Sequence, residues 1–204
     1  SWMVMIETWN ELHEATEISE TVEYGREYLD LTRNYTALFK QGAQLPGSGD
    51  FEGARQVSLK LQGDKSEGIT PASTADGAWE LADYEGSQVI RMAQGSGPGH
   101  FLYFAVDDSF WFDGEGPIEL VVEYWATPGV NLSLEYDSSD TAASHSGAYK
   151  LMVVETQREG WTTALFRLED ARFINRQNAR ADLRLSGGES LAVRALTLSK
   201  LKED

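Results

Sequence analysis

From residue 50 onward, the sequence is built of short segments in which apolar and polar residues alternate, separated by clusters of Gly, Pro, Asn, Asp and Ser. A period of two places successive side chains on opposite faces of a strand, so each segment predicts a strand with one buried face. The expected strands cover residues 56–62, 88–93, 100–106, 117–126, 131–136, 149–155, 161–168, 181–186 and 190–200. This pattern, with no convincing helix, predicts a mainly β domain, namely a β-sandwich with jelly-roll topology.

The first 42 residues follow a different pattern. An apolar run at residues 2–6 predicts a buried strand, and apolar positions between Val22 and Tyr35 recur at helical spacing. A strand, a polar loop and a helix make one unit of a (β/α)8 barrel, whose chemistry lies at the C-terminal ends of strands. We therefore divide the chain into the end of a barrel (1–42), a linker rich in Gly and Pro (43–49) and a sandwich domain (50–204). A barrel needs about 200 residues by itself, so we expect its other units upstream of Ser1.

The charge of the chain limits its partners. It has 33 acidic and 17 basic residues and a formal net charge of −16, whereas nucleic acids and anionic membranes select basic surfaces. We therefore expect neither as a partner; a neutral polysaccharide, or solubility alone, accounts better for the acidity. The chain contains no cysteine, which excludes disulfides and thiolate metal sites. It also has no apolar run long enough to span a membrane.

The loop after the first expected strand reads Trp-Asn-Glu-Leu-His-Glu-Ala-Thr-Glu-Ile at residues 9–18. This stretch resembles the last βα unit of family 99 glycoside hydrolases, which include endo-acting α-mannosidases and α-mannanases, and of the similar WbsX-like proteins. It departs from their motif at Leu12, Ala15, Glu17 and Ser19. The resemblance implies that the parent protein is a glycoside hydrolase that degrades polysaccharide.

The same resemblance implies roles for the residues of this loop. Glu14 matches the general acid/base and Glu11 the base that acts on the sugar 2-hydroxyl, with Trp9, Asn10 and His13 as substrate contacts. Residue types alone leave open that both glutamates are solvated loop residues. Catalysis also requires groups from several strand ends and a pocket that excludes water. A single βα unit supplies neither, so we expect this chain alone to be inactive.

The second domain resembles another group of proteins. Residues 101–108, 134–138, 171–178 and 181–182 are similar to galactose-binding-like β-sandwiches appended to bacterial polysaccharide-degrading enzymes, many of which act as carbohydrate-binding modules. The resemblance implies a noncatalytic module that binds polysaccharide or oligosaccharide and keeps an upstream catalytic barrel near its substrate. It also implies a secreted, periplasmic or cell-surface location in a bacterium.

Sugar binding requires aromatic rings that stack on the C–H face of a pyranose and planar polar groups that take its hydroxyls. Each aromatic could instead be a core residue, because small sandwiches bury their tryptophans; we assign Trp125, inside an expected strand, to the core. His100 and His145 are assigned either to the surface or to internally hydrogen-bonded positions. Candidate aromatics on turn-like segments are Trp79, Tyr84, Trp111, Tyr149 and Trp161. Candidate polar partners are Asp137, Arg172, Asn175, Gln177, Asn178 and Asp182.

No cofactor is expected to be required, but a structural calcium ion is a candidate because calcium takes several oxygen ligands. Asp50 with Glu52 is the first candidate site, and the aspartates within 107–113 and 137–140 are others; turn-forming aspartates explain the same pattern.

Three functions stay open. The first, which we favour, is noncatalytic glycan binding; the second is a share in an active glycosidase through Glu11 and Glu14; the third is a structural sandwich that caps the barrel.

Overall fold

The computed structural model describes residues 19–21, 25–40, 49–61, 67–93, 100–156 and 158–201. Contacts divide the chain into two compact units, residues Ser1–Leu45 and Pro46–Asp204. In the first unit the helix α1 (Glu27–Lys40) confirms the expected helix, and Glu27 and Asp30 favour its first turn because their charges complement the helix dipole. The expected strand at residues 2–6 and the loop at 9–18 lie outside the described residues.

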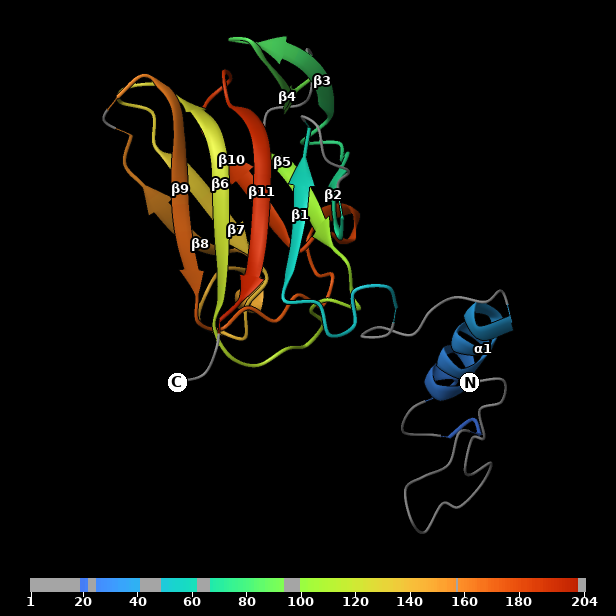
Figure 1. Ribbon diagram of the computed structural model, residues 1–204. Helices are drawn as coiled ribbons and strands as arrows, with labels where there is room; N and C mark the ends of the chain where they lie inside the picture. The colour runs from blue at the N-terminus through green and yellow to red at the C-terminus, as the bar shows by residue number, and fades with distance from the viewer. Residues whose placement is uncertain are drawn as a thin grey trace. The chain divides into compact units, whose positions relative to one another are not determined.

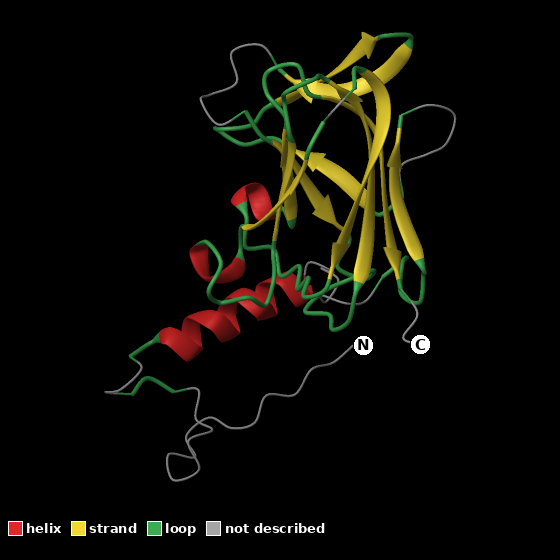
Figure 2. Ribbon diagram, turned by 90° about the vertical axis from the view of Figure 1, so that its left-hand side faces the viewer, coloured by secondary structure: helices red, strands yellow, loops and turns green. Residues whose placement is uncertain are grey.

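The second unit is the predicted β-sandwich of two antiparallel sheets (Figures 1 and 2). The first sheet runs in the order β3-β4-β11-β6-β9, with β1 also paired to β11, and the second in the order β2-β5-β10-β7-β8. All connections between consecutive described strands except β3–β4 and β7–β8 cross between the sheets, as in the expected jelly roll. The strands are β1 (Gln56–Lys60), β2 (Ile69–Ala72), β3 (Trp79–Tyr84), β4 (Ser87–Met92), β5 (Leu102–Val106), β6 (Ile118–Ala126), β7 (Leu132–Tyr136), β8 (Lys150–Val154), β9 (Gly160–Leu168), β10 (Leu183–Ser186) and β11 (Ala192–Lys200).

All nine predicted strands are confirmed, whereas β2 and β3 were not predicted. Both are edge strands of their sheets, where the sequence requirements are weaker. Pro71 interrupts the pattern of β2, and a proline is tolerated in a strand mainly at an edge. As a consequence, Trp79 and Tyr84 lie at the two ends of β3 and not on a turn.

The core lies between the sheets and follows the period-two pattern. Along β6, Leu120, Val122 and Tyr124 point inward and are buried, and Leu134 on β7 and Leu183 on β10 face them from the second sheet. Burying each such side chain stabilises the fold by about 1.5–3 kcal/mol. Trp125 alternates with these residues and lies on the outer face of the first sheet, so its assignment to the core was wrong.

Two short helical turns, η1 (His145–Gly147) and η2 (Asn178–Arg180), lie on one side of the sandwich (Figure 2). The first lies between β7 and β8, and the second lies between β9 and β10, so each is next to a strand of the second sheet. Residues of these turns and the strand ends beside them enclose the cleft described next.

Candidate functional site

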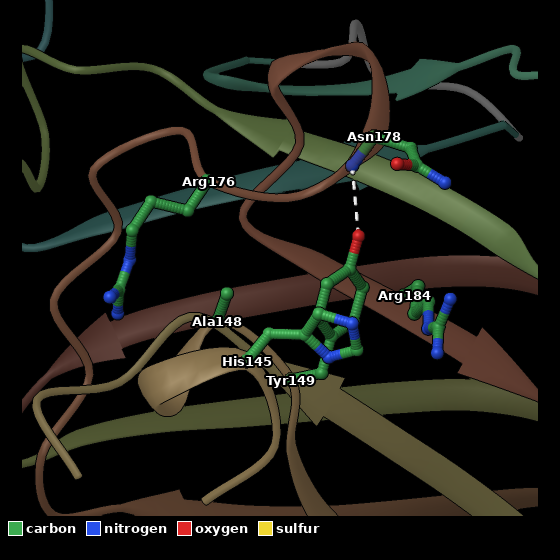
Figure 3. A pocket seen from close by; sticks show the side chains of 6 residues that line it. All are labelled: His145, Ala148, Tyr149, Arg176, Asn178 and Arg184. Carbon is green, nitrogen blue, oxygen red and sulfur yellow. Dashed lines mark hydrogen bonds between the residues drawn. The ribbon is translucent and has the colours of Figure 1, made fainter. Parts of the chain in front are cut away.

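A cleft of about 530 Å³ lies over the outer face of the second sheet, close to η1 and η2 (Figure 3). A volume of this size falls within the range of small-molecule sites, roughly 300–1,000 Å³. The residues that line it come from β10 and both helical turns, or lie within two residues of these turns or of β8. They are His145, Ala148, Tyr149, Arg176, Asn178 and Arg184.

Arg184 is held in place by a row of side chains across three strands. Tyr103 on β5 and Glu135 on β7 lie directly opposite Arg184 on β10, which places all three on the outer face. Arg184 Nε donates to Glu135 Oε2 at 2.6 Å, and its Nη1 donates to the Tyr103 hydroxyl at 2.7 Å. Burial opposes the charged form of Arg184, but these two hydrogen bonds outweigh it and raise the pKa. The guanidinium therefore stays charged in a fixed plane.

Aromatic rings complete the surroundings of this guanidinium. The Arg184 Cζ atom lies 3.6 Å from the ring centroid of Phe101 and 4.3 Å from that of Tyr149. Cation–π contacts of this kind contribute about 0.5–2 kcal/mol, depending on desolvation. The Tyr149 ring is thus fixed on one side by a charged neighbour and contributes to the cleft wall (Figure 3).

Asn178 is oriented by a second group of polar residues. Its Nδ2 donates to both carboxylate oxygens of Asp76 at 3.2 Å, and its backbone N–H donates to the Tyr149 hydroxyl at 3.2 Å (Figure 3). Burial raises the pKa of Asp76, but hydrogen bonds from Thr74, Tyr103 and Asn178 outweigh it and leave the pKa lowered. Burial also raises the pKa of the Tyr103 phenol to about 12, so this hydroxyl stays protonated and donates to Asp76. The amide therefore faces the cleft in a fixed orientation.

Arg176 ties together the two connections that border the cleft. Its Nε and Nη2 donate to Asp137 Oδ1 at 2.9 and 2.6 Å, and Asp137 is 0% exposed. Nη1 and Nη2 also donate to the backbone carbonyls of Ser146 and Ser138, at 2.9 and 2.6 Å. The other Asp137 oxygen accepts from the backbone N–H groups of Ile174 and of Arg176 itself. A buried ion pair therefore fixes the geometry of both loops.

The backbone around the cleft is strained at several positions. His145 and Ser146 in η1 have φ angles of 52° and 54°, and Ala179 and Arg180 at η2 have φ angles of 53° and 59°. Left-handed backbone is costly for residues other than glycine and persists where the surroundings enforce it. Here the Arg176 contacts to the Ser146 carbonyl supply part of that constraint.

His145 and Tyr149 form the aromatic side of the cleft. Their ring centroids are 5.2 Å apart at an interplanar angle of 68°, and His145 is exposed. The His145 Nδ1 atom is hydrogen-bonded to the Ser144 hydroxyl at 2.8 Å. The cleft thus offers two rings, two guanidinium groups and an amide, and none of its six lining residues is a carboxylate. Glycoside hydrolysis normally requires a pair of carboxyl groups, and none is found among these six residues.

The structure places the predicted sugar-binding residues in different environments. Tyr149 and Asn178 come together in the cleft. Asp137 and Asp182 are fully buried, so we assign them structural roles and not ligand contacts. Burial raises the pKa of Asp182 to about 7, and its oxygens accept from the backbone N–H groups of Val106 and Asn175.

The remaining predicted polar residues are also engaged internally. Arg172 is paired with Asp113 on the surface, and Asn175 Nδ2 donates to Asp108. Gln177 is buried and donates to the backbone carbonyls of Glu135 and Ala148. Two of these residues, Asn175 and Gln177, hold the loop that carries Arg176 and Asn178.

Two of the predicted aromatic residues pack into the sandwich. Trp111 is buried, and its Nε1 donates to the Ala171 carbonyl at 2.9 Å; Trp79 is partly buried against the core. These contacts account for both rings without a ligand.

The other predicted aromatics lie on the outer face of the first sheet. Trp125 contacts Tyr84 and Trp161 edge to face, with centroid distances of 5.6 and 5.5 Å. The Arg194 guanidinium lies 4.4 Å from the Trp161 ring centroid and pairs with Glu123. We call Tyr84, Trp125 and Trp161 the aromatic row; all three rings are partly exposed.

Other sequence predictions concern residues that this geometry does not test. Trp9, Asn10, Glu11, His13 and Glu14 lie outside the described residues. Asp50 and Glu52 are exposed in the turn before β1, and calcium there stays a prediction. Within the described part of the chain, no group of three or more His, Cys, Asp or Glu residues is gathered as a metal site would need.

Sequence reasoning missed four residues that line the cleft: His145, Ala148, Arg176 and Arg184. Arg184 lies in a predicted strand between two apolar residues, which indicates an outward side chain but not its neighbours. His145 is exposed, which is one of the two positions expected for it, and no local pattern places it beside Tyr149.

The sequence matches no protein-family model and no curated protein. The fold is similar to the apo CBM1 module of BiXyn10A (TM-score 0.42, 8% identity, 71% of this chain and 96% of that chain). It is also similar to the carbohydrate-binding module CBM6cm-2 of Cellvibrio mixtus lichenase 5A in complex with cellotriose (0.35, 10%, 65% and 92%). A third similar structure is a point mutant of a family 29 carbohydrate-binding module (0.33, 10%, 72% and 89%).

At these identities and scores, the ligand of this chain has to be inferred from its own side chains. None of the described helices combines the length and apolar character that crossing a membrane would need.

Proposed function

We propose that the second unit is a noncatalytic carbohydrate-binding module that holds a saccharide in the cleft beside Tyr149. The observation that carries this proposal is the combination of two rings with hydrogen-bonding groups held in fixed orientations. A sugar ring presents C–H faces to aromatic side chains and hydroxyls to planar polar groups. The cleft supplies both kinds of partner.

Fixed orientation matters for the affinity of such a site. Binding loses free energy when side chains must be ordered, at about 0.5–1.5 kcal/mol for each flexible side chain. Arg176, Arg184 and Asn178 are already ordered by Asp137, Glu135 and Asp76. This preorganisation supports binding by an open cleft that buries little area, and we expect weak affinity for a single saccharide.

The resemblance of residues 9–18 supports a wider role. We propose that the module belongs to a secreted or cell-surface bacterial glycoside hydrolase, in which Glu11 and Glu14 act once the other barrel units are present. The module would raise the effective concentration of the barrel at its polysaccharide. A coding sequence upstream of Ser1 without further βα units would contradict this role. We also propose a calcium ion near Asp50, which metal analysis of the purified chain tests.

The experiment for the cleft is affinity electrophoresis of the full chain against a panel of soluble polysaccharides. We expect retardation by at least one glycan, and loss of that retardation in Tyr149→Ala. The control variant is Tyr35→Ala, because Tyr35 is an exposed aromatic on α1 in the other unit. Retardation that survives Tyr149→Ala would move the site elsewhere, and retardation by no glycan would favour a purely structural sandwich.

The aromatic row is the second candidate location for the same function. Its rings are partly exposed beside Arg194 and Glu123, the arrangement that stacking and hydroxyl recognition require. Trp161→Ala in the same electrophoresis distinguishes the two locations. Loss of retardation in this variant, with Tyr149→Ala unaffected, would assign binding to the first sheet.

A further inference from the structure

The side chains that line the cleft are basic or neutral, although the chain as a whole is acidic. The chain carries 33 acidic and 17 basic residues, a formal net charge of −16. The six residues that line the cleft nevertheless include two arginines and a histidine and no carboxylate. The composition of the chain does not account for this lining.

Glu135 and Asp137 offset the two arginines, but both carboxylates lie behind them. Asp137 is fully buried and receives Arg176 together with two backbone N–H groups. Glu135 is mostly buried and accepts from Arg184 Nε at 2.6 Å. These carboxylates fix the planes of the guanidinium groups without lining the cleft.

The residues that hold Arg184 use only part of its hydrogen-bonding capacity. Nε serves Glu135 and Nη1 serves the Tyr103 hydroxyl, whereas Nη2 has no hydrogen-bond partner among the residues that the structure describes. The Phe101 and Tyr149 rings fix the guanidinium against rotation. A guanidinium stays charged at all ordinary pH values and presents N–H groups in a planar fork that suits carboxylates and tetrahedral oxyanions such as phosphate.

We propose that the cleft selects an anionic saccharide, one whose carboxylate or sulfate group binds the Nη2 side of Arg184. The inference rests on the proposed function and names the ligand class of the same site. Charge-assisted hydrogen bonds are roughly twice as strong as neutral ones. The Asp76 carboxylate, which holds Asn178, opposes such a ligand locally. Acidic residues farther away oppose it only weakly, because charges separated by more than about 8 Å are largely screened at physiological ionic strength.

The test compares pairs of ligands in which only one member carries the anionic group. Isothermal titration calorimetry at physiological salt measures the binding of trigalacturonate and of its methyl ester, and of a sulfated galactan trisaccharide and its desulfated form. We expect the charged member of at least one pair to bind about tenfold more tightly, a difference of about 1.4 kcal/mol. The pair that shows the preference identifies carboxylate or sulfate as the recognised group.

The outcomes separate this inference from the proposed function. Equal affinities within both pairs, with any saccharide binding in the cleft, overturn the anionic preference and leave carbohydrate binding intact. Binding of no saccharide, neutral or charged, overturns both.

A series of variants tests whether Arg184 is responsible for the preference for the charged ligand. Arg184→Lys keeps the charge but loses the planar fork, and we expect it to reduce the preference for the charged ligand to about threefold or less. Arg184→Gln should abolish the preference, and urea unfolding checks that both variants fold. The matched control is Arg167→Gln, an exposed arginine on β9, which should keep the wild-type ratio. A wild-type ratio in both Arg184 variants refutes the role of Arg184, and if neither variant folds, the ligand pairs on the wild-type chain still decide.

Discussion

The ion pair between Arg176 and Asp137 allows a quantitative test of how the cleft is built. The perturbation is Arg176→Ala, which leaves the Asp137 carboxylate, 0% exposed, without its cation. Two charge-assisted hydrogen bonds to Oδ1 disappear, and the carbonyls of Ser138 and Ser146 lose their donors. The two backbone N–H groups that reach Oδ2 stay in place.

The magnitude follows from the burial of the carboxylate. Removing one partner of a buried pair costs about 3–5 kcal/mol, because an uncompensated charge is left in the interior. The retained backbone donors place the expected loss near the lower end, at about 3 kcal/mol. With a urea m value of about 2 kcal/mol/M, the unfolding midpoint should fall by about 1.5 M.

A matched control uses another arginine of the same chain. Arg167 pairs with Glu169 at 2.7 Å, but the two side chains are 58% and 64% exposed. Exposed pairs contribute about 0–1 kcal/mol, so Arg167→Ala should shift the midpoint by about 0.5 M or less. The assay is equilibrium urea unfolding followed by near-UV circular dichroism and tryptophan fluorescence, whose transitions should coincide.

Two results would refute this reasoning. The first is an equal loss of stability in Arg176→Ala and Arg167→Ala, which would mean that burial does not set the cost. The second concerns the double variant Arg176→Ala/Asp137→Asn. Because the double variant leaves no buried charge unpaired, it should be more stable than Arg176→Ala alone. A lower stability would contradict the assigned role of Asp137.

Three further predictions address the backbone and a buried carboxyl group. Gly147→Ala should lose several kcal/mol of unfolding free energy, because its φ is 94° and an added Cβ would lie 2.6 and 2.7 Å from two backbone carbonyl oxygens; Gly129→Ala, with φ 79° and open space, is the control and should lose only about 1 kcal/mol. Glu85→Asn should stabilise the chain by roughly 0.5–1 kcal/mol in a thermal melt, because Glu85 has φ 45° in a two-residue hairpin turn that favours Asn-Gly. Asp182 has a pKa of about 7 in the fold against about 4 when unfolded, so the folded state binds the additional proton between these values. The stability of the wild type relative to Asp182→Asn should therefore fall as pH rises from 4 to 7, on the order of 4 kcal/mol in total, and a flat difference would contradict the raised pKa.

Alternation along the sequence predicted most of the fold, because each strand of a two-layer sandwich has one face against the core. It failed at the edges, where Pro71 in β2 and the polar residues of β3 hide the pattern. It was also ambiguous in β6, where Val121 and Val122 are both apolar, and Trp125 was assigned to the wrong face.

The cleft was predictable only in part. Tyr149 and Asn178 stood out because aromatic and amide side chains next to turns are typical of ligand sites. The sequence could not predict that Arg184 lies near these two residues, because its position beside Tyr149 depends on the order of strands in the second sheet. Asp137 and Asp182 were predicted as ligand contacts because a buried carboxylate and an exposed one look the same in a sequence.

The residues at the surface of the cleft are separate from the buried residues that hold its loops, and this separation affects how such a protein can diversify. The His145 side chain is exposed, and its ring is hydrogen-bonded only to the Ser144 hydroxyl among the residues described, whereas the buried Asp137 fixes the loops. Exchanges at His145 therefore leave the supporting network untouched. Under the proposed function, relatives that differ at His145 would recognise different sugars, while the hydrogen bonds between Arg176 and Asp137 stay the same.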